Sequence, residues 1–242
     1  MPIKAVLFDL DDTLYDHQHC SRRGLAAVRD RYACFQQTSF EDLERDHDYW
    51  LEHFHHRLLN GELTLNEVRV ERFHKLLNTY GAPVPRSVAE EAMTIYREAY
   101  LAAERCVPGS VALLERLRED GVKIGIVTNS TASEQIPKLQ RMGIDHLIDV
   151  LMISSEAGVI KPDPLIFKMA LDQLECCVEE VVMVGDSWSA DIAGAQAAGI
   201  RAVWINRYER VCPDGRLARE IKALEPLEEI IALLMTGIEL SG

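Results

Sequence analysis

The sequence predicts an α/β fold, a doubly wound parallel sheet interrupted by an all-helical insert. Short apolar runs without polar alternation, typical of strands buried on both faces of a parallel sheet, alternate with segments of helical period. A long stretch near the N-terminus instead carries helical patterns alone. We therefore expect a core domain of residues 1–16 and 106–242 and an inserted helical domain of residues 17–105.

Five apolar runs are the predicted strands, at residues 3–10, 122–127, 149–153, 181–184 and 202–205. Helix signals separate most of them. Ser110 can cap a helix that stops near Gly121, and Pro164 suits a first helical turn. The segment 189–198, which closes at Gly199, is expected to be one further helix. Repetition of strand, helix and strand indicates a doubly wound sheet.

The insert shows helix starts and apolar stripes. Three residue pairs resemble capping boxes: Ser39 with Asp42, Thr64 with Glu67, and Ser87 with Glu90. Trp50 and Phe54 lie on one apolar stripe, which favours packing in a core over stacking on a substrate base. The neighbouring His53, His55 and His56 do not converge on a helix, so a solvated face is favoured over a metal site.

Composition restricts the partners. The chain has 26 Lys and Arg against 39 Asp and Glu, a formal charge of −13, which argues against nucleic acid or an anionic membrane as the main partner. No stretch approaches the ~18 apolar residues of a membrane helix, and no signal peptide is expected, because aspartates directly follow the first apolar run. The six cysteines fit no zinc spacing and are expected to be free thiols. We expect a cytoplasmic monomer or homodimer.

Polar side chains follow the predicted strands. Asp9, Asp11 and Thr13 follow the first strand, Thr128 and Asn129 the second, Lys161 the third, and Asp186 with the later Asp191 the fourth. Ligands of open α/β sheets bind beyond the carboxyl ends of the strands, so we expect these residues to form one site. Helix capping is the alternative for each residue alone, but it does not account for all of them together.

This set of residues predicts phosphoryl transfer. Crowded carboxylates need a counterion, and Mg²⁺ typically takes carboxylates, waters and a phosphate oxygen. Asp9, expected to be ionised at neutral pH like an ordinary aspartate, can attack phosphorus. Asp11 can protonate the leaving oxygen and later deprotonate water. Lys161 and the metal would clamp the charge of the transferring group, while Thr128 and Asn129 would hold its oxygens.

Four motifs of this chain resemble those of the haloacid dehalogenase superfamily, in order and each after a strand. They are Asp9-x-Asp11-x-Thr13, Thr128, Lys161 and Gly185-Asp186-x-x-x-x-Asp191, and the match covers residues 3–15 and 107–206. The resemblance implies a Rossmann-like core with an inserted helical cap of the C1 type. It also implies Asp9 as nucleophile, Asp11 as acid and base, and Thr13 with Asn129 as substrate-binding residues. The implied metal is Mg²⁺, held by the Asp9 carboxylate, the Asp11 main-chain carbonyl and Asp186, with Asp191 close by.

Two residues of the first motif distinguish activities within this family. Asp11 favours a phosphatase, because dehalogenase members usually lack this second aspartate, and Thr13 favours transfer to water over phosphomutase chemistry. Residues 185–191 and 202–206 are similar to the branch containing 5′-nucleotidases and N-acylneuraminate 9-phosphatase. The expected function is therefore Mg²⁺-dependent hydrolysis of a small phosphate ester such as a nucleotide or sugar phosphate. A haloacid-type dehalogenase and a catalytically silent binding module are the alternatives.

Overall fold

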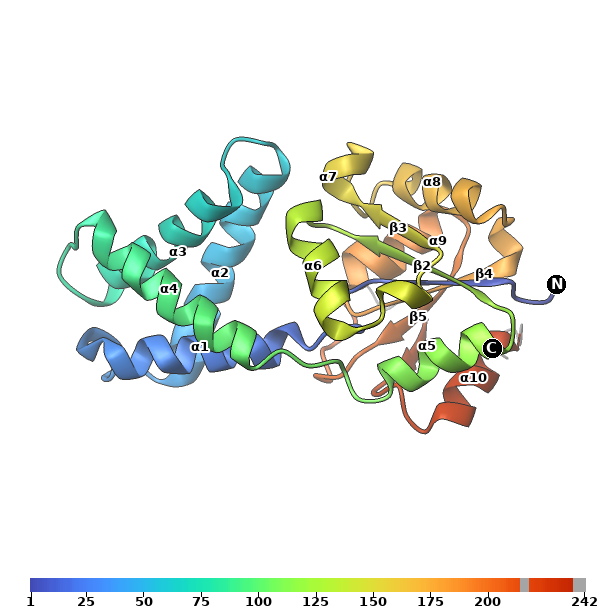
Figure 1. The fold of residues 1–242 in the computed structure, drawn as a ribbon, viewed down its shortest axis with the longest axis horizontal. Coiled ribbons are helices and arrows are strands. Elements are labelled where there is room, and N and C mark those ends of the chain that lie inside the picture. The colour runs from blue at the N-terminus through green and yellow to red at the C-terminus, as the bar shows by residue number, and fades with distance from the viewer. Residues whose placement is uncertain (214–217, 237–242) are drawn as a thin grey trace. The chain divides into compact units, whose positions relative to one another are not determined.

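The computed structural model describes residues 1–213 and 218–236 (Figure 1). The chain divides into two compact units. The first, here called the sheet unit, comprises Met1–Asp16 and Cys106–Gly242, and the second, the helical unit, comprises His17–Arg105.

The sheet unit contains a parallel six-stranded sheet in the order β3-β2-β1-β4-β5-β6 (Figure 1). The strands are β1 (Ala5–Phe8), β2 (Lys123–Thr128), β3 (Val150–Ile153), β4 (Val181–Gly185), β5 (Arg201–Ile205) and β6 (Arg219–Ile221). Each predicted strand overlaps an observed one, and the predicted α/β fold class is confirmed. The sequence analysis missed β6, because this edge strand of three residues buries only Ile221 and so carries no apolar run.

The strand order places the end of β1 at the centre of the sheet. Phe8 pairs with Ile126 of β2 on one side and with Val184 of β4 on the other. The chain adds β2 and β3 on one side of β1, then β4, β5 and β6 on the other, so the order reverses between β1 and β4. Such a reversal opens a crevice beyond the carboxyl ends of the two strands, and Asp9 and Asp186 follow directly there.

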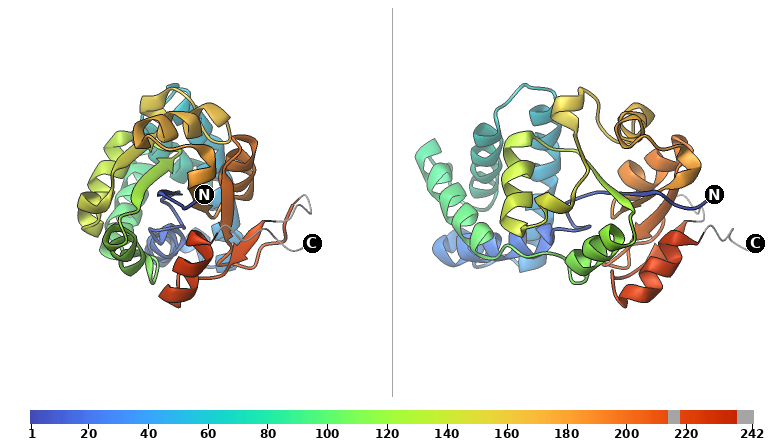
Figure 2. Two further views of the ribbon diagram at one scale, coloured as in Figure 1. Left: turned by 90° about the vertical axis from the view of Figure 1, so that its right-hand side faces the viewer. Right: turned by 45° about the vertical axis from the view of Figure 1, so that its right-hand side comes forward.

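Helices cover both faces of this sheet (Figures 1 and 2). They are α5 (Ser110–Glu119), α6 (Ala132–Met142), α7 (Ser154–Ala157), α8 (Pro164–Leu174), α9 (Gly194–Ala197) and α10 (Leu227–Met235), with short 3-10 turns η2 (Asp145–Leu147) and η3 (Val178–Glu180). Side chains of α8 such as Ile166 and Phe167 pack with Leu7 and Met183 of the central strands in one buried cluster. Burial of both faces explains why the strands read as continuous apolar runs.

The predicted helix over residues 189–198 is present at residues 188–197, but it is not a regular α-helix throughout. The structure has a π-helical turn, η4 (Trp188–Ala193), followed by the short α9. Two main-chain groups, the N–H of Asp191 and that of Ile192, donate to the carbonyl oxygen of Ser187, at 2.9 and 3.3 Å. The second of these bonds spans five residues and defines the wider turn. Asp191, whose carboxylate accepts from the N–H of Ser187 at 2.9 Å, is buried by this turn.

The helical unit consists of α1 (His17–Arg31), α2 (Phe40–Leu59), α3 (Leu65–Tyr80) and α4 (Arg86–Ala102), with a short 3-10 turn η1 (Ala33–Phe35). The capping box of Thr64 and Glu67 is confirmed, and Ser39 caps α2 as predicted. The predicted start at Ser87 is wrong, because α4 already begins after Pro85, whose fixed backbone angle suits a helix entry. No helix within residues 1–213 and 218–236 is long and apolar enough to cross a membrane.

The structure agrees with two predictions about side chains, the packing of Trp50 with Phe54 and the free cysteine thiols. Phe54 is buried and stacks on Trp50, with ring centroids 5.8 Å apart, as expected for a packed stripe. All six cysteines are free thiols, as expected.

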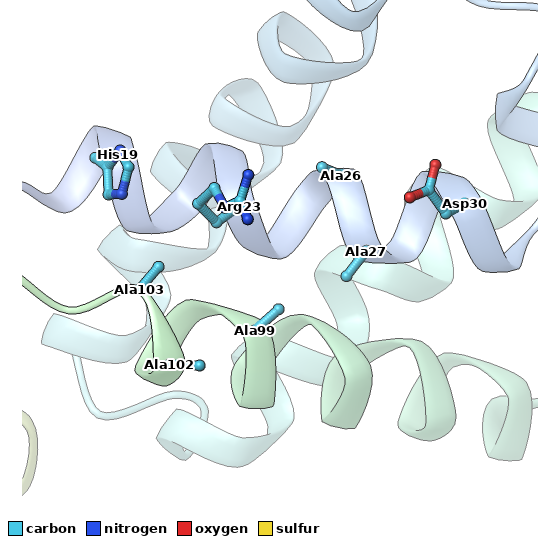
Figure 3. Close-up of a pocket in the computed structure, with 8 residues that line it drawn as sticks. All are labelled: His19, Arg23, Ala26, Ala27, Asp30, Ala99, Ala102 and Ala103. Atoms are coloured by element: carbon cyan, nitrogen blue, oxygen red, sulfur yellow. The ribbon is translucent and has the colours of Figure 1, made fainter.

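A groove of about 610 Å³ runs along α1 and α4 within the helical unit (Figure 3). Five alanines line it, from α1, α4 and the residue after α4: Ala26, Ala27, Ala99, Ala102 and Ala103. Three polar side chains of α1 complete the lining: His19, Arg23 and Asp30. The alanine side chains are small and leave space between the two helices, which accounts for the groove, and we assign it no role.

His47 of α2 is buried in the core of the helical unit. Its ring centroid lies 6.0 Å from that of Phe73 and 5.2 Å from that of Tyr96, and its Nδ1 lies 3.2 Å from Oδ1 of Asp48. Burial, reinforced by the charge of Arg72, lowers the pKa of His47 to about 4. The imidazole is therefore neutral in the folded protein at neutral pH.

Acid should destabilise the protein through His47. In the unfolded chain the imidazole titrates near an ordinary pKa of about 6.5, so the unfolded chain binds the proton preferentially as the pH falls from 6.5 towards 4. We expect the free energy of unfolding to drop by about 2 kcal/mol between pH 7 and pH 5 from this group. Urea unfolding at the two pH values measures it. His47→Gln should remove this loss, whereas His56→Gln, at an exposed position of the same helix, should retain it; equal pH dependence in both variants would contradict the assignment.

Candidate active site

Three carboxylates meet beyond the ends of β1 and β4. Asp9 follows β1, Asp186 follows β4, and Asp191 comes from η4. Among the described residues, these three offer ligand oxygens that all lie within 4.8 Å of one another. Gly185 permits this approach, because a methyl group on its Cα would come within 2.4 Å of the Asp191 side chain. The reversal of strand order thus brings the first and last motifs together.

Lys161 supplies a positive charge to this cluster. It lies in the loop before α8, and its buried ammonium donates to Oδ1 of Asp9 at 2.7 Å and to Oδ1 of Asp191 at 2.6 Å. A third bond goes to the carbonyl oxygen of Val127 at 2.7 Å. Burial alone would lower the pKa of Lys161, but the charges of Asp191 and Asp9 outweigh it and raise this pKa. Lys161 is therefore protonated and links the two carboxylates.

Asp9 is not an ordinary aspartate. Burial raises its pKa to about 7, with Lys161 acting against the rise and Asp191 adding to it. The pKa of Asp9 is therefore higher than the ordinary value expected for it from the sequence. The pKa of Asp186 is raised for the same reasons, by burial and by the charges of Asp9 and Asp191.

The donor set fits a hard divalent cation. Three carboxylates lie close to only one buried ammonium among the described residues, that of Lys161. The guanidinium of Arg210, which is half exposed, lies 3.3 Å from Oδ2 of Asp186. Carboxylate oxygens are the ligands that Mg²⁺ prefers, and a bound cation favours their charged forms. The raised pKa values of Asp9 and Asp186 indicate the charge surplus that such an ion would neutralise.

Two further predicted residues, Thr13 and Asn129, contact Asp9 and Lys161. The Thr13 hydroxyl, fully buried, donates to Oδ2 of Asp9 at 3.3 Å. Asn129 pairs with the main chain of Lys161 in both directions, donating at 2.9 Å and accepting at 2.8 Å. These contacts describe Asn129 as a residue that holds the lysine loop, and its substrate contact stays a prediction. Thr128 accepts a hydrogen bond from Gln135 at 3.0 Å.

Asp11 lies apart from the three clustered carboxylates and contacts α6. Its carboxylate accepts from Nζ of Lys138 at 2.6 Å and from Nε2 of Gln135 at 2.9 Å. Neither Lys138 nor Gln135 was predicted from the sequence. The available signal was a glutamine and a lysine three positions apart, hence on one face of the helix that follows Thr128. Arg210, which reaches Asp186 from the loop after β5, was not predicted either.

The chain matches one known family of hydrolases. The model of the haloacid dehalogenase-like hydrolases matches residues 3–199. The chain belongs to this hydrolase family. The resemblance inferred from the four motifs is thereby confirmed.

Relatives of this haloacid dehalogenase-like hydrolase include named phosphatases. The chain is 35% identical over 218 residues to ribulose-1,5-bisphosphate 5-phosphatase of Halopiger xanaduensis, covering 85% of each protein. It is 31% identical over 232 residues to pyrimidine 5′-nucleotidase YjjG of Escherichia coli, covering 93% of this chain and 96% of that relative. A solved 2-haloacid dehalogenase of Pseudomonas syringae pv. Tomato DC3000 is 30% identical with a TM-score of 0.61, covering 96% of this chain and 99% of that one.

Proposed function

We propose that this chain is a Mg²⁺-dependent phosphomonoester hydrolase that acts on a small phosphorylated metabolite through an aspartyl phosphate on Asp9. The sheet unit is the catalytic core and the helical unit is the cap. One observation carries the proposal: Asp9 lies within 4.8 Å of two further carboxylates and 2.7 Å from the buried ammonium of Lys161. Phosphatases among the relatives of the chain support the same reaction class.

The reaction proceeds in two transfers. A carboxylate oxygen of Asp9 forms a bond to phosphorus, and the bond from phosphorus to the ester oxygen breaks. Asp11 gives its proton to that leaving oxygen. Asp11 then takes a proton from a water molecule whose oxygen attacks the phosphorus, which releases phosphate and restores the Asp9 carboxylate.

The other residues position and neutralise charge. The ammonium of Lys161 offsets the charge on Asp9 and on the approaching phosphoryl group, and the Thr13 hydroxyl orients Asp9. When bound, Mg²⁺ supplies the positive charge that lets anionic groups gather at this site. Its ligands would be the carboxylates of Asp9, Asp186 and Asp191 and the main-chain carbonyl of Asp11.

A haloacid-type dehalogenase is the second candidate, favoured by the likeness to the Pseudomonas enzyme. Asp11 counts against it, because displacement of a halide needs no proton donor for the leaving group. The Lys138 ammonium donates to the Asp11 carboxylate at 2.6 Å, so the structure holds this aspartate in a defined position. Halide release from 2-haloacids without phosphate release from any ester would establish this candidate instead.

A phosphate-release screen across small phosphate esters, with and without EDTA, tests the proposal. We expect turnover of at least one ester, a fall of about 10³-fold or more after chelation, and recovery on adding Mg²⁺. The recovery serves as the control for damage by the chelator. Full activity in EDTA would contradict the metal assignment, and no phosphate release from any ester would contradict the function.

A further inference from the structure

The helix α6 directs two buried polar side chains at Asp11. Lys138 is 4% exposed and donates to Oδ1 of Asp11 at 2.6 Å, while Gln135 is fully buried and donates to Oδ2 at 2.9 Å. Each donor thus holds a different oxygen of one carboxylate. A carboxylate held at a single oxygen can still pivot about that contact, whereas donors on both oxygens fix its plane as well as its position.

Both donors are themselves held in place. Nε2 of Gln135 also donates to the Thr128 hydroxyl at 3.0 Å, which ties α6 to the end of β2. The Lys138 ammonium lies 4.6 Å from the centroid of the fully buried Tyr15 ring, which belongs to the same loop as Asp11. The contacts therefore join α6, β2 and the loop after β1 around the Asp11 carboxylate.

Packing alone does not require these residue types. Burying an ammonium and an amide costs free energy unless each finds a partner, and apolar side chains such as Leu139 fill the neighbouring buried position of α6. The Asp11 side chain is about one third exposed, at 34%. Two buried polar groups thus bind a carboxylate that is still partly exposed. A group that exchanges protons with a substrate needs such exposure.

We propose that Lys138 and Gln135 are positioning residues that fix the Asp11 carboxylate for proton transfer to the leaving oxygen. This inference rests on the proposed phosphatase function. An alkyl leaving group needs that proton, because its alkoxide is a poor leaving group. The p-nitrophenolate anion leaves without it. Loss of positioning should therefore slow alkyl esters more than p-nitrophenyl phosphate.

The test is the ratio of kcat/KM for an alkyl phosphate to kcat/KM for p-nitrophenyl phosphate, because kcat/KM reports the first transfer. Lys138→Met should lower the alkyl value about 10²-fold and the aryl value less than about 10-fold. Lys138→Arg, which keeps the cation, should restore the ratio to within a few-fold of wild type. Gln140→Leu, at an exposed position of α6, is the matched control for Gln135→Leu and should leave the ratio unchanged.

The Asp11→Asn variant is the background in which Lys138→Met tests whether Lys138 acts through Asp11. If Lys138 acts through Asp11, Lys138→Met should not change the ratio further in that background. Equal losses on both esters, or a further fall of the ratio in the Asp11→Asn background, would overturn the positioning role while leaving the phosphatase function standing. Failure of wild type to release phosphate from any ester would overturn the function itself. Should Lys138→Met not fold, Gln135→Asn, which keeps the amide but withdraws it by one methylene, answers the same question.

Discussion

Asp9→Asn should abolish phosphate release while leaving the protein folded. The substitution keeps the shape of the side chain but removes the carboxylate that forms the bond to phosphorus. We expect kcat to fall about 10⁴-fold or more, because the neutral amide of asparagine cannot attack phosphorus as the Asp9 carboxylate does. Phosphate release from the ester identified in the screen measures the loss.

The same variant should be at least as stable as wild type in EDTA at pH 8. Asp9 has a pKa of about 7 in the folded protein, above its ordinary value of 3.8, so its ionisation opposes folding as the pH rises through that range. A neutral asparagine avoids this cost, and the melting temperature should hold or rise by a few degrees. Asp172→Asn, at an exposed position of α8, is the control and should change neither property. An active Asp9→Asn enzyme would refute the nucleophile assignment.

Lys161→Met should lower both activity and stability. The ammonium bridges Asp9 and Asp191 at 2.7 and 2.6 Å, so its removal leaves two buried carboxylates facing each other without a counter-charge. Losing one partner of a buried ion pair costs about 3 kcal/mol or more. Activity should fall about 10²–10³-fold, because the pKa of Asp9, which Lys161 lowers, rises further and the phosphoryl charge loses its clamp.

Mg²⁺ should recover part of the stability of this variant. A cation between the carboxylates offsets the charge that the lysine balanced, so the melting temperature of Lys161→Met should rise more on adding Mg²⁺ than that of wild type. Thermal unfolding with and without Mg²⁺, alongside kcat, checks this. Lys168→Met, which removes an exposed lysine of α8, is the matched control. Wild-type kcat in Lys161→Met would rule out a role for this ammonium in the reaction.

The positions of the main elements follow from local signals. Apolar runs mark five of the strands because burial on both faces removes any polar alternation, although the first run, over residues 3–10, is longer than β1. The motifs at the strand ends follow from the same regularity, since parallel strands deliver their carboxyl ends to one edge of the sheet. Two elements with weak sequence signals were not predicted correctly. Strand β6 buries one residue of three and so carries no apolar run. Helix α4 begins after Pro85 and not at the capping box predicted at Ser87.

The sequence by itself determined the α/β class, the family and the residues Asp9, Lys161 and Asp186 as partners in one site, because these depend on patterns and spacing along the chain. The tertiary structure alone decided how those residues behave. The raised pKa of Asp9, the pairing of Asn129 with the lysine loop, and the hold of α6 on Asp11 all depend on distances between segments far apart in the chain. Burial and opposed charges act through space, so no local pattern encodes them.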